Sequence, residues 1–108
     1  MAEIRVTLSE SALGDLEGIR EWYEEQGVSD VGKRLLLEIL EHIETLADRP
    51  EIGRVVPEFG QIFLRELIHP PFRIVYRLDP GRVRIVRVWR GERLLRLPPS
   101  TRFPSPED

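Results

Sequence analysis

The alternation of apolar and polar positions is clearest between residues 72 and 89, where it predicts a β-hairpin. The segments 72–78 and 83–89 are rich in β-branched and aromatic residues, which favour strands. Asp79, Pro80 and Gly81 lie between them and supply a reverse turn, because Pro presets φ early in the turn and Gly accepts a positive φ. The second strand of this hairpin is expected to be central in a sheet.

The two faces of the hairpin differ in chemistry. Side chains alternate across a strand, so Ile74 and Tyr76 share one face while Arg73 and Arg77 share the other. In segment 83–89 neither face is purely apolar, which is typical of an interior strand with helices on one side. We expect Arg73 and Arg77 to project away from the helices and to form an open guanidinium surface, since no other segment is predicted to cover it.

Other segments have a regular period as well. Apolar and polar residues alternate over 3–8, residues 62–68 are predicted to form a further strand, and apolar residues recur at helical spacing over 9–26 and 29–49. Ser9 and Ser29 stand where helix N-caps are wanted, Gly27 can end the first helix, and Pro50 ends the second. The short connection between the helices predicts an antiparallel helical hairpin.

The order of these elements predicts the fold class. A strand, two helices and three strands indicate an α+β domain, in which an antiparallel two-helix hairpin packs on one face of an antiparallel sheet completed by three C-terminal strands. The chain has 108 residues, enough for one domain with a single core. We assign residues 1–97 to this domain and residues 98–108 to a flexible, proline-rich tail.

Residues 50–61 are a longer connection than is usual. Such a segment is either functional or packed by its own apolar side chains. We favour packing, through side chains spread along the segment: Ile52, Val55, Val56 and Phe59.

Composition excludes several kinds of chemistry. There is no Cys, which rules out thiol catalysis and thiolate zinc sites. The two His residues, His42 and His69, do not have metal-ligand spacing, so we expect neither a metal nor a cofactor. The sequence shows neither a secretion signal nor an apolar run of the roughly 20 residues that cross a membrane, and a cytoplasmic protein is expected.

Charge is segregated along the chain. Residues 1–61 hold 6 basic and 14 acidic side chains, and residues 62–108 hold 10 basic and 5 acidic ones. Such asymmetry can produce a local positive field that attracts an acidic protein segment or a nucleic-acid backbone. The alternative is that an acidic helical half simply lies against a basic sheet, or that the arginines serve solubility and strand protection.

The chain resembles the RelE/ParE superfamily of bacterial toxins over about residues 3–97. The resemblance is carried by residues in the first helix, in the segment 50–58 and in the strands: Ala12, Asp15, Leu16, Ile19, Tyr23, Pro50, Gly53, Arg54, Val56, Pro57, Glu58, Leu64, Arg65, Glu66, Leu67, Phe72 to Arg77, Val83, Ile85, Val86, Val88 to Gly91 and Arg93. This resemblance implies a toxin that is neutralised by a cognate antitoxin in a hetero-oligomeric complex.

The superfamily contains two activities, and the residues favour one of them. RelE-like members cleave mRNA on the ribosome, whereas ParE-like members poison DNA gyrase. Cleavage without a metal needs groups that accept and donate protons. RelE-like proteins use lysines where this chain has Leu64 and Glu66, and a Tyr or His near the C-terminus, but this chain has no Tyr after Tyr76 and no His after His69. Arginine is a poor base because its pKa exceeds about 12.

We therefore predict a ParE-like gyrase inhibitor, with a RelE-like ribonuclease and an inactive, antitoxin-binding family member as alternatives. The residues predicted to contact the target are Arg65, Arg73, Arg77, Arg87, Trp89, Arg90 and Arg93. A ribonuclease would draw its catalytic residues from Arg73, Arg90, Arg93 and His69. The residues predicted to contact the antitoxin are Leu16, Ile19, Tyr23, Arg73 and Arg77, in an apolar groove between the first helix and the sheet.

Overall fold

The computed structural model describes residues 4–91, in which both predicted helices and all predicted strands are present. The helices are α1 (Glu10–Glu25) and α2 (Ser29–Glu44), and a 3₁₀ turn, η1 (Thr45–Ala47), follows α2. The strands are β1 (Arg5–Leu8), β2 (Arg54–Val55), β3 (Leu64–His69), β4 (Phe72–Asp79) and β5 (Arg82–Arg90). Arg93, the predicted domain end at residue 97 and the predicted tail 98–108 lie outside the described residues.

The strands form one mixed sheet in the order β1-β5-β4-β3-β2. β2, β3, β4 and β5 pair antiparallel, as predicted, but β1 pairs parallel with β5. The prediction of a wholly antiparallel sheet was therefore wrong at its first strand. The alternation of side chains identifies a strand but does not set its direction relative to a partner more than 70 residues away in the chain.

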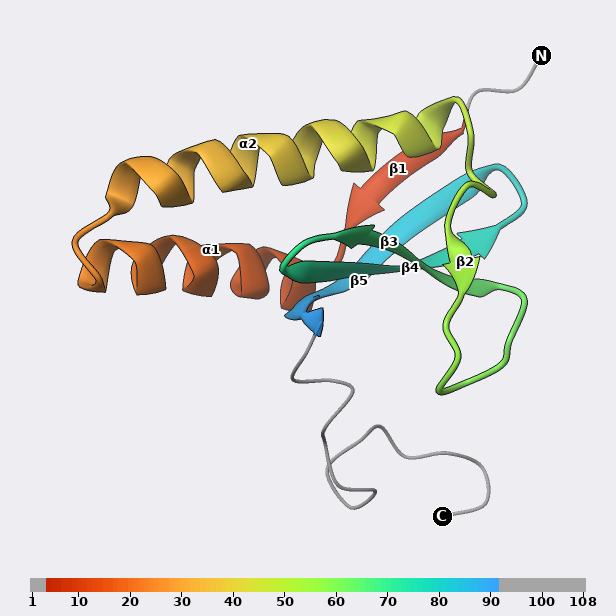
Figure 1. Cartoon of the computed structure of the whole chain (residues 1–108). Coiled ribbons are helices and arrows are strands. Elements are labelled where there is room, and N and C mark those ends of the chain that lie inside the picture. Colours follow the sequence, from red (N-terminus) through yellow and green to blue (C-terminus); the bar gives the residue numbers. More distant parts are fainter. Residues whose placement is uncertain (1–3, 92–108) are drawn as a thin grey trace.

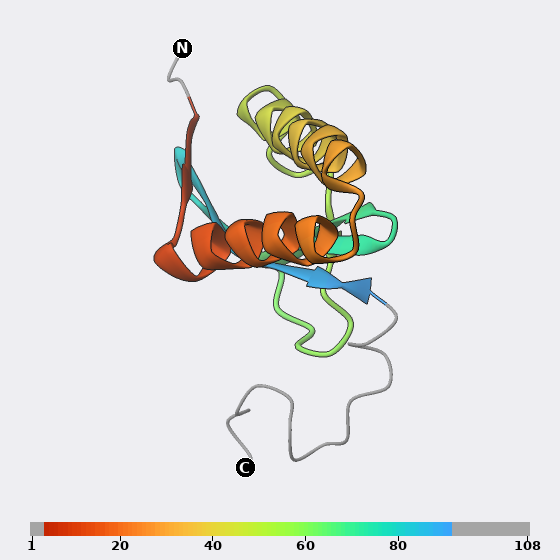
Figure 2. The ribbon, with the colours of Figure 1, turned by 90° about the vertical axis from the view of Figure 1, so that its left-hand side faces the viewer.

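The two helices cover one face of the sheet (Figures 1 and 2). Between the layers lies a core to which both helices, η1 and three strands contribute. Its buried apolar residues are Ala12, Ile39, Ile43, Leu46, Leu67, Phe72, Ile74, Tyr76, Val83, Ile85 and Val88. This arrangement confirms the predicted α+β architecture.

The start of α1 is tied to the sheet through its N-cap. Ser9 accepts a hydrogen bond from the backbone N–H of Ala12 at 3.0 Å and donates its hydroxyl to the carbonyl of Val86 at 3.0 Å. Gly27 follows the helix with φ of 77°, as its predicted role requires. The N-cap of α2 is Val28 rather than Ser29, which is the first helical residue, and no side chain caps this helix.

A β-bulge explains why neither face of segment 83–89 is purely apolar. Val75 pairs with Arg87 and Tyr76 pairs with Ile85, so one residue of β5, Val86, lies between these pairs without a partner in the register. The extra residue shifts the alternation. Val88 consequently joins Ile85 on the side of the helices, while Arg87 lies on the opposite side.

The segment between β2 and β3 crosses the face of the sheet that the helices leave open (Figures 1 and 2). Its Val56 is buried, its Glu58 reaches Arg73, and its Phe59 lines a hollow with Val75. Packing of this segment was predicted, although Ile52 is exposed rather than packed. Our expectation that no segment of the chain covers this face was wrong.

Within residues 4–91, neither helix has the length and apolar character that crossing a bilayer would require.

Candidate functional site

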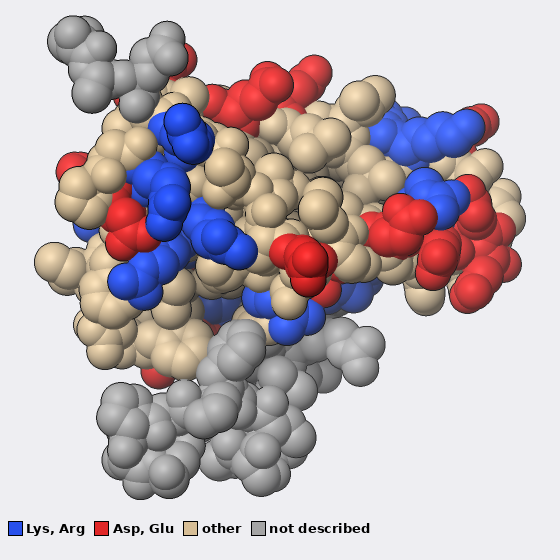
Figure 3. Space-filling view, turned by 180° about the vertical axis from the view of Figure 1, so that it is seen from behind, with Lys and Arg blue, Asp and Glu red and all other residues tan. Residues whose placement is uncertain are grey.

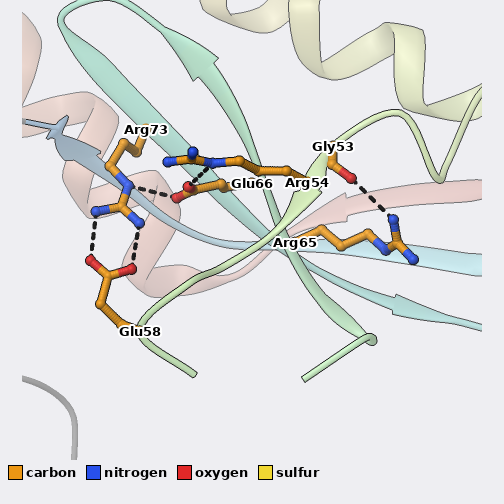
Figure 4. Close-up of polar contacts among 6 residues, drawn as sticks. All are labelled: Gly53, Arg54, Glu58, Arg65, Glu66 and Arg73. Atoms are coloured by element: carbon orange, nitrogen blue, oxygen red, sulfur yellow. Dashed lines mark hydrogen bonds and ion pairs between the residues drawn. The ribbon is translucent and has the colours of Figure 1, made fainter. Parts of the chain in front are cut away.

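Two carboxylates of the chain hold Arg73 on β4. Its Nε donates to Glu66 Oε1 at 2.6 Å, and its two terminal nitrogens donate to the two oxygens of Glu58 at 2.8 Å each. Arg54 Nε donates to the second oxygen of Glu66 at 2.6 Å, as Figure 4 shows. The side chains of Glu66 and Arg73 are 0% and 4% exposed. We call Arg54, Glu58, Glu66 and Arg73 the buried ion network.

The strand register brings this network together. Glu66 pairs with Val75 on β4, and Arg73 lies two residues before Val75, so the two charged side chains are diagonal neighbours on the face opposite the helices. Glu58 arrives from the segment between β2 and β3. The network therefore attaches that segment to the sheet.

Glu58 and Arg73 hold each other in the charged form. Hydrogen bonds from Arg73 hold the pKa of the Glu58 carboxyl below its usual value. Hydrogen bonds to Glu58 in turn raise the pKa of the Arg73 guanidinium. Arg73 consequently stays protonated in the folded protein and has no proton-transfer role.

The prediction that Arg73 belongs to an exposed contact surface was wrong. Its guanidinium does point away from the helices, as predicted, but the carboxylates of Glu58 and Glu66 occupy its donors. Neither a target nor an antitoxin can contact this group unless the segment bearing Glu58 moves. Arg73 is thus a structural residue.

Arg65 holds the backbone of the preceding segment. It pairs with Tyr76 and therefore lies on the side of the helices, not beside Arg73. Its guanidinium donates to the carbonyls of Ile62 at 3.0 Å, Gly53 at 3.1 Å and Glu51 at 3.3 Å. Figure 4 shows Arg65 directed away from the buried ion network. Arg65 therefore does not share a face with Arg73 and Arg77, and its contact with the target stays a prediction.

The last part of β5 carries the predicted Arg87, Trp89 and Arg90. Arg87 donates to both oxygens of Asp15 on α1, at 2.8 and 2.9 Å, and lies 4.8 Å from the centre of the Trp89 ring. The hydrogen bonds to Asp15 raise the pKa of Arg87. Arg90 lies 5.6 Å from the ring centre of Trp22 on α1. All three predicted residues are half-buried, and Arg87 and Arg90 contact residues of α1.

The residues named for a ribonuclease do not converge. His69, Phe72 and Arg90 are in register across β3, β4 and β5, which places His69 and Arg90 on the side of the helices. Arg73 lies on the other face of the sheet and is buried. Arg93 is outside the described residues. The sheet itself thus separates the groups that would have to act on one phosphate.

His69 contacts the other histidine of the chain. His69 Nδ1 and His42 Nδ1 are 3.0 Å apart, and His69 Nε2 is 3.5 Å from Glu38 of α2. Burial, and secondarily the charge of His69, lowers the pKa of His42. Among residues 4–91, no three His, Cys, Asp or Glu side chains cluster as metal ligands would.

This histidine pair predicts a loss of stability in mild acid. Because the pKa of His42 is lower in the folded chain, the unfolded chain binds its proton first as the pH falls below about 6.5. The free energy of unfolding should therefore fall between pH 7.5 and pH 5.5, and less so in His42→Gln, which cannot titrate. Urea unfolding at both pH values measures the difference. Equal losses in the two proteins would show that His42 does not cause the effect.

The residues predicted for antitoxin binding on α1 contribute to the core. Leu16, Ile19 and Tyr23 are partly buried and pack against the core between the helices and the sheet. The chain's own side chains therefore occupy much of the space between α1 and the sheet, and contact of these three residues with the antitoxin stays a prediction. The apolar residues that α2 leaves exposed are Leu37, at 63%, and Leu40, at 40%.

The open cationic surface is formed by Arg77, which was predicted to be open, and by three arginines that were not predicted as site residues: Arg5, Arg82 and Arg84. Arg77 remains exposed, with its guanidinium 4.7 Å from the ring centre of Phe63. Arg84 pairs with Arg77, and Arg82 pairs with Arg5 on β1. Figure 3 shows Lys and Arg gathered over the sheet, at the end away from the α1–α2 turn. The alternation in β5 was visible in the sequence, but the pairing of Arg5 with Arg82 was not.

A hollow of about 360 Å³ lies near these arginines on the same face. Its lining is mostly apolar and comes from α1, β3, β4, β5 and the segment between β2 and β3. The lining residues are Ser11, Phe59, Leu64, Val75, Val86 and Arg87.

This arrangement matches solved structures of toxin–antitoxin systems. The chromosomal ParDE system of P. aeruginosa has a chain with a TM-score of 0.69 and 20% identity, covering 81% of this chain and 95% of that one. A chain of the toxin-antitoxin complex RelBE2 from Mycobacterium tuberculosis has a TM-score of 0.61 and 20% identity, covering 83% and 93%. The helical hairpin on one face of the sheet is therefore the fold of RelE/ParE-type toxins.

The sequence identifies the family within this class. Residues 6–95 match the model of the ParE toxin of the type II toxin-antitoxin system parDE. The chain belongs to this ParE toxin family. A comparison with curated protein sequences finds no match.

Proposed function

We propose that this protein is the toxin of a type II toxin–antitoxin pair that binds DNA gyrase in the cytoplasm and interferes with its cycle. A cognate antitoxin neutralises it by forming a hetero-oligomer. Membership of the ParE family supports the toxin role. The choice of a gyrase inhibitor over a ribonuclease is supported by the buried ion network.

That network removes the arginine on which RNA cleavage would depend. The guanidinium of Arg73 donates its hydrogen bonds to Glu58 and Glu66. These carboxylates would repel a phosphate placed beside Arg73. His69 and Arg90 lie beyond the sheet from Arg73. Metal-free cleavage needs an acid, a base and a cation within reach of the same phosphate. Binding to a protein target requires no such convergence.

The C-terminal half of β5 is the proposed contact with gyrase. Trp and Arg are the residue types most enriched at binding hot spots, and Arg87 and Trp89 lie together on the face opposite the helices, while Arg90 follows Trp89 on the other face. Asp15 orients Arg87, whose guanidinium in turn lies against the Trp89 ring. A contact arranged in this way loses little side-chain freedom when a partner binds.

The exposed apolar residues of α2 are the proposed binding site for the antitoxin. Leu37 and Leu40 are one helical turn apart on the same side of α2, where an amphipathic segment of a partner can cover them. Burying a Leu side chain contributes about 1.5–3 kcal/mol. This surface replaces Leu16, Ile19 and Tyr23, which the core already uses.

Two assays with purified components test the proposal. We expect the protein to inhibit supercoiling by DNA gyrase and to leave mRNA on translating ribosomes intact. Trp89→Ala should weaken the inhibition at least tenfold, because truncating a central hot-spot residue costs about 2 kcal/mol or more. Leu37→Ala is the matched control, since it also truncates a large apolar side chain but lies on α2.

The opposite results would decide between the alternatives. Ribosome-dependent cleavage without any effect on gyrase would identify a ribonuclease. No effect in either assay, from a protein that still binds the product of the neighbouring gene, would identify an inactive family member. Equal losses of inhibition in Trp89→Ala and Leu37→Ala would show that β5 is not the contact with gyrase. Circular dichroism of each variant excludes unfolding as the cause.

A further inference from the structure

Four arginines from three adjacent strands form a surface that the proposed gyrase contact does not include. Arg5 of β1, Arg77 of β4, and Arg82 and Arg84 of β5 are all exposed and lie on the face opposite the helices. We call these four residues the arginine patch. It lies at the β4–β5 turn, at the other end of β5 from Trp89.

The strand register places like charges directly opposite each other. Arg5 pairs with Arg82, and Arg77 pairs with Arg84. Directly opposed like charges in a sheet destabilise it. Within these cross-strand rows the acidic side chain is Asp79, which is 3.1 Å from Arg77 and is paired with Arg82. A single carboxylate thus lies among four guanidinium groups, which leaves a net positive charge on this part of the sheet.

Structural explanations do not account for this arrangement. Charged residues often protect an edge strand from pairing with another chain, which can explain Arg5 on the edge strand β1. The other three arginines lie on β4 and β5, which are interior strands with partners on both sides. Solubility requires charge, yet not arginines placed opposite arginines. Sequences break such local rules mainly at functional sites. The patch therefore indicates an anionic ligand that is absent from the isolated chain.

The geometry favours a regular polyanion. Residues two apart on one strand are about 6.7 Å apart, and neighbouring strands are about 4.8 Å apart, so the four guanidinium groups form a shallow grid. Arginine binds phosphate through two parallel hydrogen bonds. The apolar hollow near the patch is lined by none of the four arginines, so the patch itself offers a peptide no anchoring pocket.

We propose that the arginine patch binds the phosphate backbone of double-stranded DNA. The choice of duplex DNA over RNA rests on the proposed function, because gyrase holds a DNA duplex while it works. The patch contacts the phosphates of that duplex while the other end of β5 contacts the enzyme. Contact with phosphates alone carries no sequence information, so binding is independent of base sequence.

Direct binding to DNA tests this inference without gyrase. We measure fluorescence anisotropy of a labelled 30-base-pair duplex with the full chain at 50–200 mM salt. Four phosphate contacts predict a slope of about −3.6 in log affinity against log salt, which is a loss of about 100-fold over this range. Arg82→Glu combined with Arg84→Glu should reduce the slope by about 2 and the affinity at 50 mM salt by at least tenfold.

Lys33→Glu combined with Arg34→Glu is the matched control. It makes the same change in charge on exposed residues of α2, whose Arg34 side chain is 67% exposed. Charges separated by more than about 10 Å are largely screened at 0.1 M salt, so this variant should bind DNA within about twofold of the original chain. Equal losses of DNA affinity in the two double variants would show that the arginine patch is not the binding site. The DNA would then be attracted by the overall charge of the protein.

Stability gives an independent check through a single variant. Arg84→Glu turns the Arg77–Arg84 pair into a pair of opposite charges, so the midpoint of thermal unfolding should rise while DNA binding weakens. A lower midpoint would contradict the repulsion on which the inference depends. Arg82→Gln/Arg84→Gln then separates lost DNA binding from lost fold, because it removes the charges without introducing carboxylates.

Competition experiments identify the class of anion. Unlabelled duplex DNA should displace the labelled duplex, whereas an equal concentration of polyglutamate should not. Displacement by polyglutamate, or tighter binding of single-stranded RNA than of duplex DNA, would overturn the assignment. Binding of DNA by a protein that leaves gyrase active would refute the proposed function alone. Unchanged gyrase inhibition together with unchanged DNA binding in Arg82→Glu/Arg84→Glu would refute the patch alone.

Discussion

Replacing Arg73 with methionine is expected to lower the free energy of unfolding by about 3–5 kcal/mol, because it strands a buried carboxylate. Glu66 is 0% exposed at its side chain and would keep only Arg54, whose own side chain is 56% exposed. Small domains have about 5–15 kcal/mol of stability in total, so this loss is a large part of it. Urea unfolding followed by circular dichroism measures the change.

Arg77→Met is the matched control for this substitution. Arg77 lies four residues further along β4 on the same face, but its side chain is 50% exposed and its carboxylate partner is Asp79 at 3.1 Å. Exposed ion pairs contribute about 0–1 kcal/mol, so this variant should be nearly as stable as the original protein. If Arg73→Met were no more destabilising than Arg77→Met, the buried ion network would not be structural.

A double variant distinguishes the destabilisation caused by the unpaired Glu66 carboxylate from that caused by lost packing. In Arg73→Met/Glu66→Met both buried charges are replaced by apolar groups of similar length, which is often neutral or stabilising. Glu58, exposed at 29% of its side chain, can then turn to water. The double variant should therefore recover most of the stability. Failure to recover would show that lost packing, rather than the Glu66 carboxylate, destabilises the single variant.

This result bears on any test of toxicity. A substitution at Arg73 that abolishes growth inhibition would report an unfolded toxin, because the side chain is inside the protein. Substitutions at Arg82 and Arg84 test a surface instead. The two kinds of variant must be distinguished by their unfolding transitions before a loss of toxicity is assigned to a contact.

Gly53→Ala is expected to destabilise the protein by about 3 kcal/mol through overpacking and lost hydrogen bonds. A Cβ at this position would lie 2.6 Å from the hydroxyl of Tyr76 and 2.7 Å from the backbone carbonyl of Glu66. That hydroxyl accepts a hydrogen bond from Gly53 N–H at 3.0 Å and donates one to the Pro50 carbonyl at 2.7 Å. Neither the carbonyl nor the hydroxyl can move without breaking these contacts.

The control for Gly53→Ala is the same substitution in an open place. Gly18 lies in α1, and a Cβ there would meet nothing within 4 Å. Ala in a helix is more stable than Gly by about 0.5–1 kcal/mol, so Gly18→Ala should raise the free energy of unfolding. Thermal unfolding of both variants gives the comparison. A tolerated Gly53→Ala would mean that the segment 50–56 is not held closely to Tyr76.

The sequence predicted the elements because their signals are local. Helical spacing, the Ser9 cap, Gly27 and the turn at Pro80 depend on residues within a few positions of one another, and all of these features are present. The order of the elements then limited the arrangement to helices on one face of a sheet. The resemblance to RelE/ParE toxins came from the same local motifs.

The candidate site was harder to predict because it depends on contacts between distant segments. Arg73 was expected to be open since the alternation in β4 says which way a side chain points, but not what lies in front of it. The carboxylate of Glu58, which lies 15 residues away in the sequence, accepts hydrogen bonds from Arg73. Leu16, Ile19 and Tyr23 were expected to line a groove, whereas the pairing of α1 with α2 and the sheet fills that space.

The sequence by itself therefore determined the helices, the strands, the direction in which Arg73 and Arg77 point, and the family. Only the tertiary structure decided that Arg73 is buried, that β1 runs parallel to β5, and that Arg5, Arg77, Arg82 and Arg84 share a surface. The physical reason is the distance along the chain over which each signal acts. Backbone periodicity follows from neighbouring residues, whereas the burial of a charge and the register of strands follow from segments that meet only when the chain has folded.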